Sequence, residues 1–188
     1  SDHENLISKI KMLGLHGLSR DAWKRFESSN RRTYDVKEIG FKMNLTDIQS
    51  AIGIVQLERI EEMRKRRREI WNFYNQNLLD LPIELPSMPK KKGSIHAMHL
   101  YACGLPKNID RDDFVWKAAH EHGVTFGVHY KSINTFSIYK SILPEYEPVK
   151  ALPVSFDWGN RTISLSCSAG TSHSHCERVV DTLRKLLK

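Results

Sequence analysis

The sequence lacks the long apolar runs and paired cysteines that mark membrane and disulfide-rich proteins. No stretch approaches the ~20 uncharged apolar residues that a bilayer-spanning helix needs, and the opening SDHENLISKI has no apolar core of a signal peptide. The cysteines number only three and have no CxxC spacing, which argues against a disulfide framework and a zinc knuckle. We therefore expect a soluble, cytoplasmic protein without membrane association. Its three thiols should be reduced, and two of them should be packed in the interior.

What is present suits a globular chain. Its 188 residues are 40% hydrophobic and 27% charged, which is enough for one domain, or for one domain with an attached segment. The net charge of +7 favours acidic partners in general, among them nucleic acids, anionic membranes and phosphorylated sugars. Composition alone does not choose among these partners.

Helical spacing dominates the first half of the sequence. A first helix from Leu6 should stop at Gly14 or Gly17, and the polar residues 18–40 then predict a loop. The capping box T-x-x-Q at 46–49 opens a helix that should run for about thirty residues, to near Leu79. Three prolines and the lysine run in residues 82–93 predict a solvated linker.

The second half predicts three short strands and two further helices. Residues 96–105, 124–130 and 161–167 are the expected strands, and residues 131–160 are expected to be irregular. Asp110 is a good N-cap for a helix that ends at Gly123, and residues 172–187 form the closing helix. The predicted fold is α/β of an α+β-like kind: a long helix plus a short three-stranded sheet covered by helices.

Seven short blocks resemble one family of enzymes, in the family's order. They are HGLSRDAW at 16–23, YDV at 34–36, GFKMNLTDIQSAIG at 40–53, RRR at 66–68, HAMHLY at 96–101, GVHY at 127–130 and LSCSAG at 165–170. Together they make the chain similar to the C-terminal part of the pyridoxal-phosphate (PLP) sugar aminotransferases of the DegT/DnrJ/EryC1/StrS type. The resemblance covers essentially the whole chain.

The resemblance implies a fold-type I enzyme that moves an amino group from an amino acid to a keto group on a nucleotide-linked sugar, and that works as a homodimer. It divides the chain into residues 1–45, which lead out of a large domain, and residues 46–188, the C-terminal small domain. In the family, the lysine that attaches PLP precedes the region matched here. We therefore expect no catalytic residue in these 188 residues, no PLP bound to this chain alone, and no amino transfer by it.

Two residues of the GFKMN block are candidate cofactor ligands. In the family, the asparagine that matches Asn44 reaches the PLP phosphate of the neighbouring subunit, and an amide beside a helix N-terminus suits an anion. Lys42 could add positive charge to the same site. The alternative is that Asn44 or Thr46 only caps the long helix.

The segment that follows the second expected strand aligns with nucleotide-sugar contacts of the family. His129, Tyr130 and Asn134 are the candidate substrate-binding residues. The family usually has histidine at the position of Asn134 and proline at that of Ser132, so this chain is a divergent member. The alternative for His129 is an ordinary residue at the end of a strand.

Three other classes of function remain as alternatives. A non-catalytic remnant that serves as a binding or dimerisation module would expose apolar surface on the long helix and on residues 1–45. A nucleic-acid-binding protein could use the basic run 59–68, but interleaved glutamates favour helical ion pairs on a solvated face, so no nucleic-acid partner is expected. A metal site is not expected, because His120 and His122, at i and i+2 on a helix, point to different faces.

Overall fold

The computed structural model describes residues 2–18, 35–89, 91–142 and 147–187. Most of the predicted loop at residues 18–40 lies outside this part of the chain. Two compact units, Ser1–Glu58 and Arg59–Lys188, are described separately below. The predicted boundary after residue 45 concerns two domains of a longer protein and stays a prediction.

The N-terminal unit is built on α1, Glu4–Gly14, which confirms the predicted first helix. The chain returns past the end of this helix, where Leu15 pairs with Lys42 in a single antiparallel bridge. The Phe41 amide donates to the Leu13 carbonyl at 2.7 Å, and the Met43 amide donates to that of Gly14 at 2.8 Å. These bonds fix the backbone on both sides of Lys42.

The predicted long helix is divided into α2, Asp47–Glu58, and α3, Ile60–Asn77. The capping box at its start is confirmed: the Thr46 amide donates to Gln49 Oε1 at 2.9 Å, and the Gln49 amide donates to Thr46 Oγ1 at 3.3 Å. The expectation of one uninterrupted helix was wrong at Arg59. Its ψ of −2° is far from the α-helical value, so the regular hydrogen-bond ladder is interrupted there.

The sheet of the C-terminal unit has two strands, β1 (Tyr101–Gly104) and β2 (Thr162–Leu165). They run antiparallel, with Tyr101 opposite Leu165. The predicted third strand at 124–130 was wrong, because it is reduced to one bridge between Gly127 and Ser164. The first residue of that segment caps the preceding helix instead of starting a strand, since the Val124 amide donates to the Ala118 carbonyl beyond the last helical residue.

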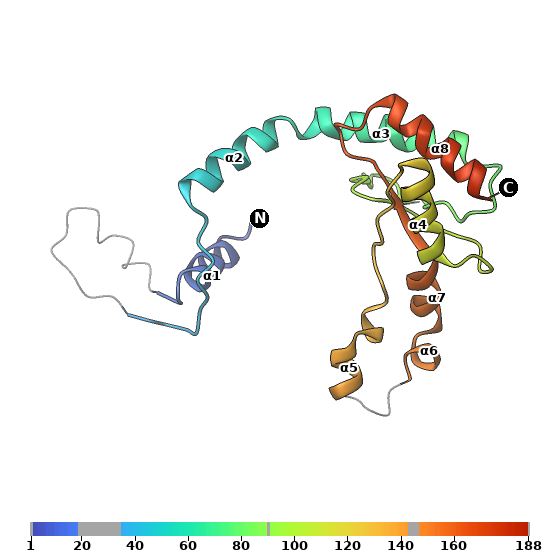
Figure 1. Cartoon of the computed structure of the whole chain (residues 1–188). Coiled ribbons are helices and arrows are strands. Elements are labelled where there is room, and N and C mark those ends of the chain that lie inside the picture. Colours follow the sequence, from blue (N-terminus) through green and yellow to red (C-terminus); the bar gives the residue numbers. More distant parts are fainter. Residues whose placement is uncertain (1, 19–34, 90, 143–146, 188) are drawn as a thin grey trace. The chain divides into compact units, whose positions relative to one another are not determined.

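Two predicted helices cover the core face of this sheet (Figure 1). In α4, Arg111–His122, the Asp110 side chain accepts a hydrogen bond from the Asp113 amide at 2.8 Å, and Gly123 ends the helix with φ of 65°, both as predicted. The closing helix α8, His173–Leu187, packs against α3 and α4. Its apolar stripe of Val179, Val180 and Leu183 is buried.

Aromatic side chains form the centre of the core. The ring of Tyr101 lies 4.8 Å from that of Trp71 and 5.1 Å from that of Tyr74, and all three side chains are fully buried. All three cysteines are buried and free, whereas only two were expected to be packed. Burial raises the pKa of the Cys103 thiol to about 12, which keeps it protonated and unreactive at neutral pH.

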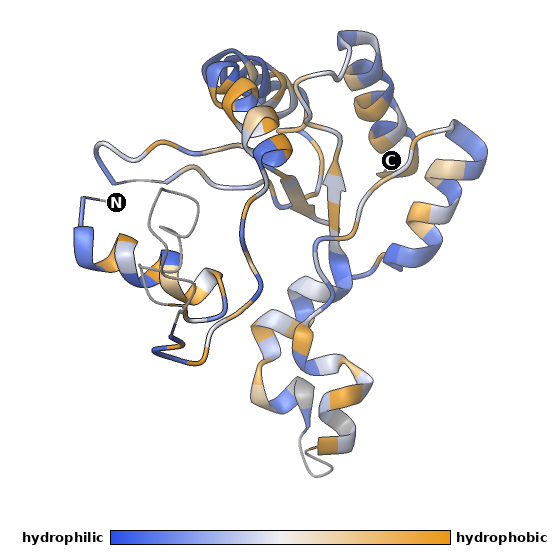
Figure 2. Cartoon of the chain, turned by 90° about the vertical axis from the view of Figure 1, so that its left-hand side faces the viewer, coloured by the Kyte–Doolittle hydropathy of each residue, from blue (hydrophilic) through white to orange (hydrophobic). Residues whose placement is uncertain are grey.

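Residues 131–161 contain short helices where an irregular segment was expected. These are the 3-10 turn Ile133–Thr135, α5 at Ser137–Ile142, α6 at Pro148–Ala151 and α7 at Pro153–Arg161. Proline occupies the first position of both α6 and α7, where its missing N–H costs nothing. Ile138 and Ile142 of α5 are largely exposed. Figure 2 colours the chain by hydropathy and shows hydrophobic stretches along these short helices.

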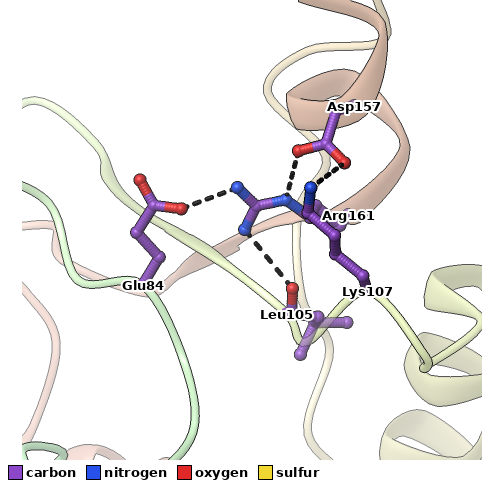
Figure 3. Close-up of polar contacts among 5 residues, drawn as sticks. All are labelled: Glu84, Leu105, Lys107, Asp157 and Arg161. Carbon is purple, nitrogen blue, oxygen red and sulfur yellow. Dashed lines mark hydrogen bonds and ion pairs between the residues drawn. The ribbon is translucent and has the colours of Figure 1, made fainter. Parts of the chain in front are cut away.

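Arg161, the last residue of α7, joins three parts of the C-terminal unit (Figure 3). Its Nε donates to Asp157 at 2.8 Å, and its Nη2 donates to Glu84 at 2.6 Å. Lys107 lies 3.5 Å from the second oxygen of Asp157. This ionic network holds α7 against the edge of the sheet, where Glu84 pairs with Gly104.

The network makes the C-terminal unit sensitive to acid. Arg161, and to a smaller extent Lys107, hold the pKa of Asp157 below its ordinary value of 3.8. A carboxylate with a depressed folded-state pKa contributes stability that is complete above its unfolded pKa and is lost as the pH falls through the folded one. We expect the urea concentration at the unfolding midpoint to decrease as the pH is lowered from about 5 to about 2.5. The urea midpoint of Asp157→Asn should decrease less over this range. An equal decrease in both proteins would contradict the role given to Asp157.

Candidate functional site

The N-terminal unit presents Lys42 and Asn44 on the segment that leads into α2. Both side chains are exposed, and the backbone of Lys42 is held in its bridge to Leu15. Thr46, and not Asn44, makes the capping hydrogen bonds of α2. The side-chain amide of Asn44 has no hydrogen bond to any residue that the structure describes. Its N–H donors are therefore available to a ligand near the N-terminus of α2.

In the C-terminal unit, the imidazole of His129 folds back over Gly127. A Cβ atom at Gly127 would lie 2.7 Å from His129 Cε1 and 3.1 Å from its Nδ1, so only glycine accommodates the ring in this position. Nδ1 is buried and has no partner among the described residues. The ring of Tyr130 meets that of His129 edge to face at 4.8 Å, and the Tyr130 side chain is 67% exposed.

Asn134 lies in the 3-10 turn that follows. Its Oδ1 accepts a hydrogen bond from Ser132 Oγ, which also lies 2.7 Å from Ser155 Oγ. The side-chain oxygen of Asn134 is therefore engaged within the loop. The contact between Ser132 and Ser155 joins this loop to α7. The structure brings His129, Tyr130 and Asn134 into one segment of the C-terminal unit, while Lys42 and Asn44 belong to the N-terminal unit.

The lysines offer no buried amine in the part of the chain that is described. Lys117 is half-buried, and all other lysine side chains placed by the structure are exposed. Asp113 accepts a hydrogen bond from Lys117 and raises its pKa, which favours the charged ammonium over a nucleophilic amine. None of these side chains has the desolvated setting that a cofactor-attaching lysine needs.

The histidines are engaged in other contacts or lie apart. His120 stacks on Trp116 with ring centroids 4.4 Å apart, and His173 lies 3.5 Å from Glu177. Among the described residues, no three histidine, cysteine or acidic side chains are grouped to hold a metal ion. Within the same residues, no helix is long and apolar enough to cross a membrane.

Sequence reasoning missed the partial burial of three arginines. The predicted helical ion pairs do form, between Arg64 and Glu61 at 2.5 Å and between Arg66 and Glu69 at 3.0 Å. However, Arg64, Arg66 and Arg67 are half-buried instead of lying on a solvated face. Their spacing from the buried apolar residues of α3 was the signal that could have shown this.

The model of the DegT/DnrJ/EryC1/StrS aminotransferase family matches residues 1–184. The chain belongs to this family. In this member, the GFKMN segment lies in the N-terminal unit and the GVHY segment in the C-terminal unit. The predicted membership is therefore confirmed.

Two curated relatives are similar in sequence. The chain is 29% identical to the spore coat polysaccharide biosynthesis protein SpsC of Bacillus subtilis over 191 aligned positions, which cover 100% of this chain and 48% of SpsC. It is 49% identical over 112 residues to the uncharacterized protein MJ1066 of Methanocaldococcus jannaschii, covering 59% of this chain and 28% of that protein. The family member thus spans about half, or less, of these relatives' length.

Solved sugar aminotransferases share the fold. The putative sugar aminotransferase Spr1654 from Streptococcus pneumoniae, in its PMP-form, matches 99% of this chain and 46% of its own, with a TM-score of 0.83 and 23% identity. PseC of Helicobacter pylori, an aminotransferase of pseudoaminic acid biosynthesis, matches 100% of this chain and 47% of its own, with a TM-score of 0.78 and 23% identity. The mixed helix and strand arrangement is therefore that of PLP sugar aminotransferases.

Proposed function

We propose that these 188 residues form part of a PLP-dependent nucleotide-sugar aminotransferase, contributing to the phosphate end of the cofactor site and to the sugar-nucleotide site. The observation that carries the proposal is the unengaged amide of Asn44. Thr46 already caps α2, so Asn44 is not needed for the fold of the helix start. An amide donor and a helix N-terminus together favour a phosphate group.

The residues present can bind the phosphate group of PLP, but they include no lysine suited to attach PLP covalently in the part of the chain that is described. Asn44 can donate a hydrogen bond to a phosphate oxygen, and Lys42 supplies positive charge two residues earlier. When bound, PLP withdraws electrons from the carbon that carries the transferred amino group. The exposed lysines of the described residues suit solvent contact, so we propose that this chain alone neither binds PLP covalently nor transfers an amino group.

The nucleotide sugar would meet the segment of His129 and Tyr130. Gly127 holds the imidazole of His129 in one position, and the exposed ring of Tyr130 offers a face on which a nucleobase or a sugar can pack. Asn134 lies in the turn that follows and is the third residue of the proposed substrate segment. A dianionic diphosphate also suits the net charge of +7.

A second copy of the chain would cover α2 in the complete assembly. None of the residues of this helix is buried, and Ile48, Ile52 and Leu57 are each more than half exposed. A helix that is apolar on several sides is normally covered by protein. We propose a homodimer in which this surface is buried and Asn44 reaches the site of the partner.

The first experiment combines PLP, borohydride reduction and intact mass measurement of the 188-residue chain. We expect no specific adduct, whereas stoichiometric modification of one lysine would overturn the proposal that the attaching residue lies elsewhere. UDP binding, followed by saturation-transfer NMR, should weaken in His129→Ala and remain unchanged in the control His122→Ala. Equal binding by both variants would remove the sugar-nucleotide role of His129.

A non-catalytic binding or dimerisation module is the second candidate, because it expects the same exposed apolar surface. It also expects no PLP adduct. It differs in expecting no affinity of this chain for UDP. The UDP measurement therefore separates the two proposals.

A further inference from the structure

The inward-facing side of α3 ends in two arginines where apolar residues would be expected. Ile70, Trp71 and Tyr74 bury their side chains in the core, and Arg66 and Arg67 lie one turn earlier on the same helical face. Both arginines are half-buried. Removing a guanidinium from water is costly unless it finds hydrogen-bond acceptors or a counter-ion.

The two arginines differ in the partners that they find. Arg66 Nη1 donates to Glu69 at 3.0 Å, and Arg66 Nη2 donates to the Thr171 carbonyl at 2.9 Å. This second bond fixes the loop before α8 against α3. Arg67 Nε, in contrast, is buried and has no acceptor in the part of the chain that the structure describes. The site therefore has a donor for which the described residues supply no acceptor.

A cavity of about 640 Å³ lies between the arginine side of α3 and the loop Ser168–Gly170. This volume is within the range of small-molecule sites. Its lining residues are Arg59, Glu62, Met63, Lys65, Arg66, Arg67, Glu69, Ser168, Ala169 and Gly170. Four of them are cations and two are carboxylates, and Glu69 is already paired with Arg66. The cavity therefore has an excess of positive charge.

We propose that this cavity binds a phosphate group of a small phosphorylated ligand. Arg67 lines the cavity and would turn its guanidinium so that the unpaired Nε–H, which is covered in the free chain, meets a phosphate oxygen. A guanidinium matches the geometry of phosphate. Arg59, the residue immediately before α3, also lines the cavity and adds a second cation. The opposite wall leaves room for the ligand, because even a Cβ atom at Gly170 would meet no atom within 4 Å.

This anion site is independent of the proposed aminotransferase function. It uses none of Lys42, Asn44, His129, Tyr130 or Asn134. A chain that binds no sugar nucleotide could still bind phosphate in this cavity, and the converse also holds. The two proposals can therefore fail separately.

The test is an NMR titration of the 188-residue chain with inorganic phosphate and with pyrophosphate in about 0.15 M sodium chloride, which screens weak surface binding. The Arg67 Nε–Hε signal, assigned by its loss in Arg67→Lys, should shift and saturate. Arg67→Gln should weaken binding about tenfold, as expected for the loss of one hydrogen bond to a charged group.

Two further variants keep the test decisive. Arg64→Gln is the matched control, because Arg64 pairs with Glu61 and does not line the cavity, and it should bind as the unaltered chain does. Gly170→Glu places a carboxylate in open space on the loop and should abolish binding without disturbing the core. An absent or non-saturating shift, or equal weakening by Arg64→Gln and Arg67→Gln, would overturn the site. Stronger binding of a single-stranded oligonucleotide would overturn the small-ligand assignment.

Discussion

Replacing Trp71 by alanine will lower the free energy of unfolding of the C-terminal unit by about 3 to 5 kcal/mol. Trp71 is 1% exposed, and its ring contacts Tyr101 edge to face at 4.8 Å and His96 at 4.9 Å. Truncation removes this burial and leaves a cavity between α3 and β1. The surrounding aromatic rings are too rigid to fill it.

Urea unfolding followed by far-ultraviolet circular dichroism measures this loss. Trp116→Ala is the matched control, since Trp116 is 55% exposed on α4 and contacts mainly His120. Its effect should stay within about 0.5 kcal/mol, as for most surface substitutions. If both variants lost the same stability, the core would not be centred on Trp71.

Replacing Gly40 by alanine will detach the segment that carries Lys42 and Asn44 from the end of α1. A Cβ atom there would lie 2.1 Å from the Gly17 nitrogen and 2.8 Å from the Leu13 carbonyl oxygen. Both are backbone atoms, which cannot move aside as a flexible side chain can. Such overpacking costs about 1 to 3 kcal/mol, a large share of what holds this small unit together.

Hydrogen exchange of the Phe41 and Met43 amides reports this change, because they donate to the Leu13 and Gly14 carbonyls. Both amides should exchange at least about tenfold faster in Gly40→Ala. Gly53→Ala is the control: its added methyl meets no atom within 4 Å, and alanine favours a helix interior. Unchanged protection in Gly40→Ala would show that these bonds do not hold the segment.

The helix ends were the part of the fold that the sequence predicted best. Asp110 and Gly123 bound α4 as expected, because an N-cap carboxylate and a left-handed glycine act through neighbouring backbone atoms alone. The third strand could not be judged in the same way. Whether residues 124–130 pair along their length depends on Ser164, which is distant in sequence, and the structure gives them a single bridge.

Proline has two roles in residues 131–160. The segment was expected to be irregular, yet Pro148 and Pro153 each stand at the first position of a short helix. Proline at that position is compatible with a helix, so the sequence permitted both interpretations. Packing of the loop, in which Ser132 meets Ser155, accompanies the helical choice.

The candidate ligand-binding residues were predictable only through the resemblance to a family. Spacing indicated a cap at Asn44 or Thr46, and in the structure Thr46 makes the capping hydrogen bonds. No local pattern marks Gly127 as the support of His129, since this contact depends on how the chain bends after the bridge. The inward arginines of α3, in contrast, were within reach of sequence analysis.

The pairing of β1 with β2 also constrains when this chain can fold during synthesis. Tyr101 meets Leu165, and α8 begins only at His173, so the core stays incomplete until β2 and α8 have also left the ribosome. Contacts between residues this far apart in sequence form slowly. Until then the apolar faces of α3 and α4 remain uncovered, and during this interval the nascent chain is most exposed to aggregation and to chaperones.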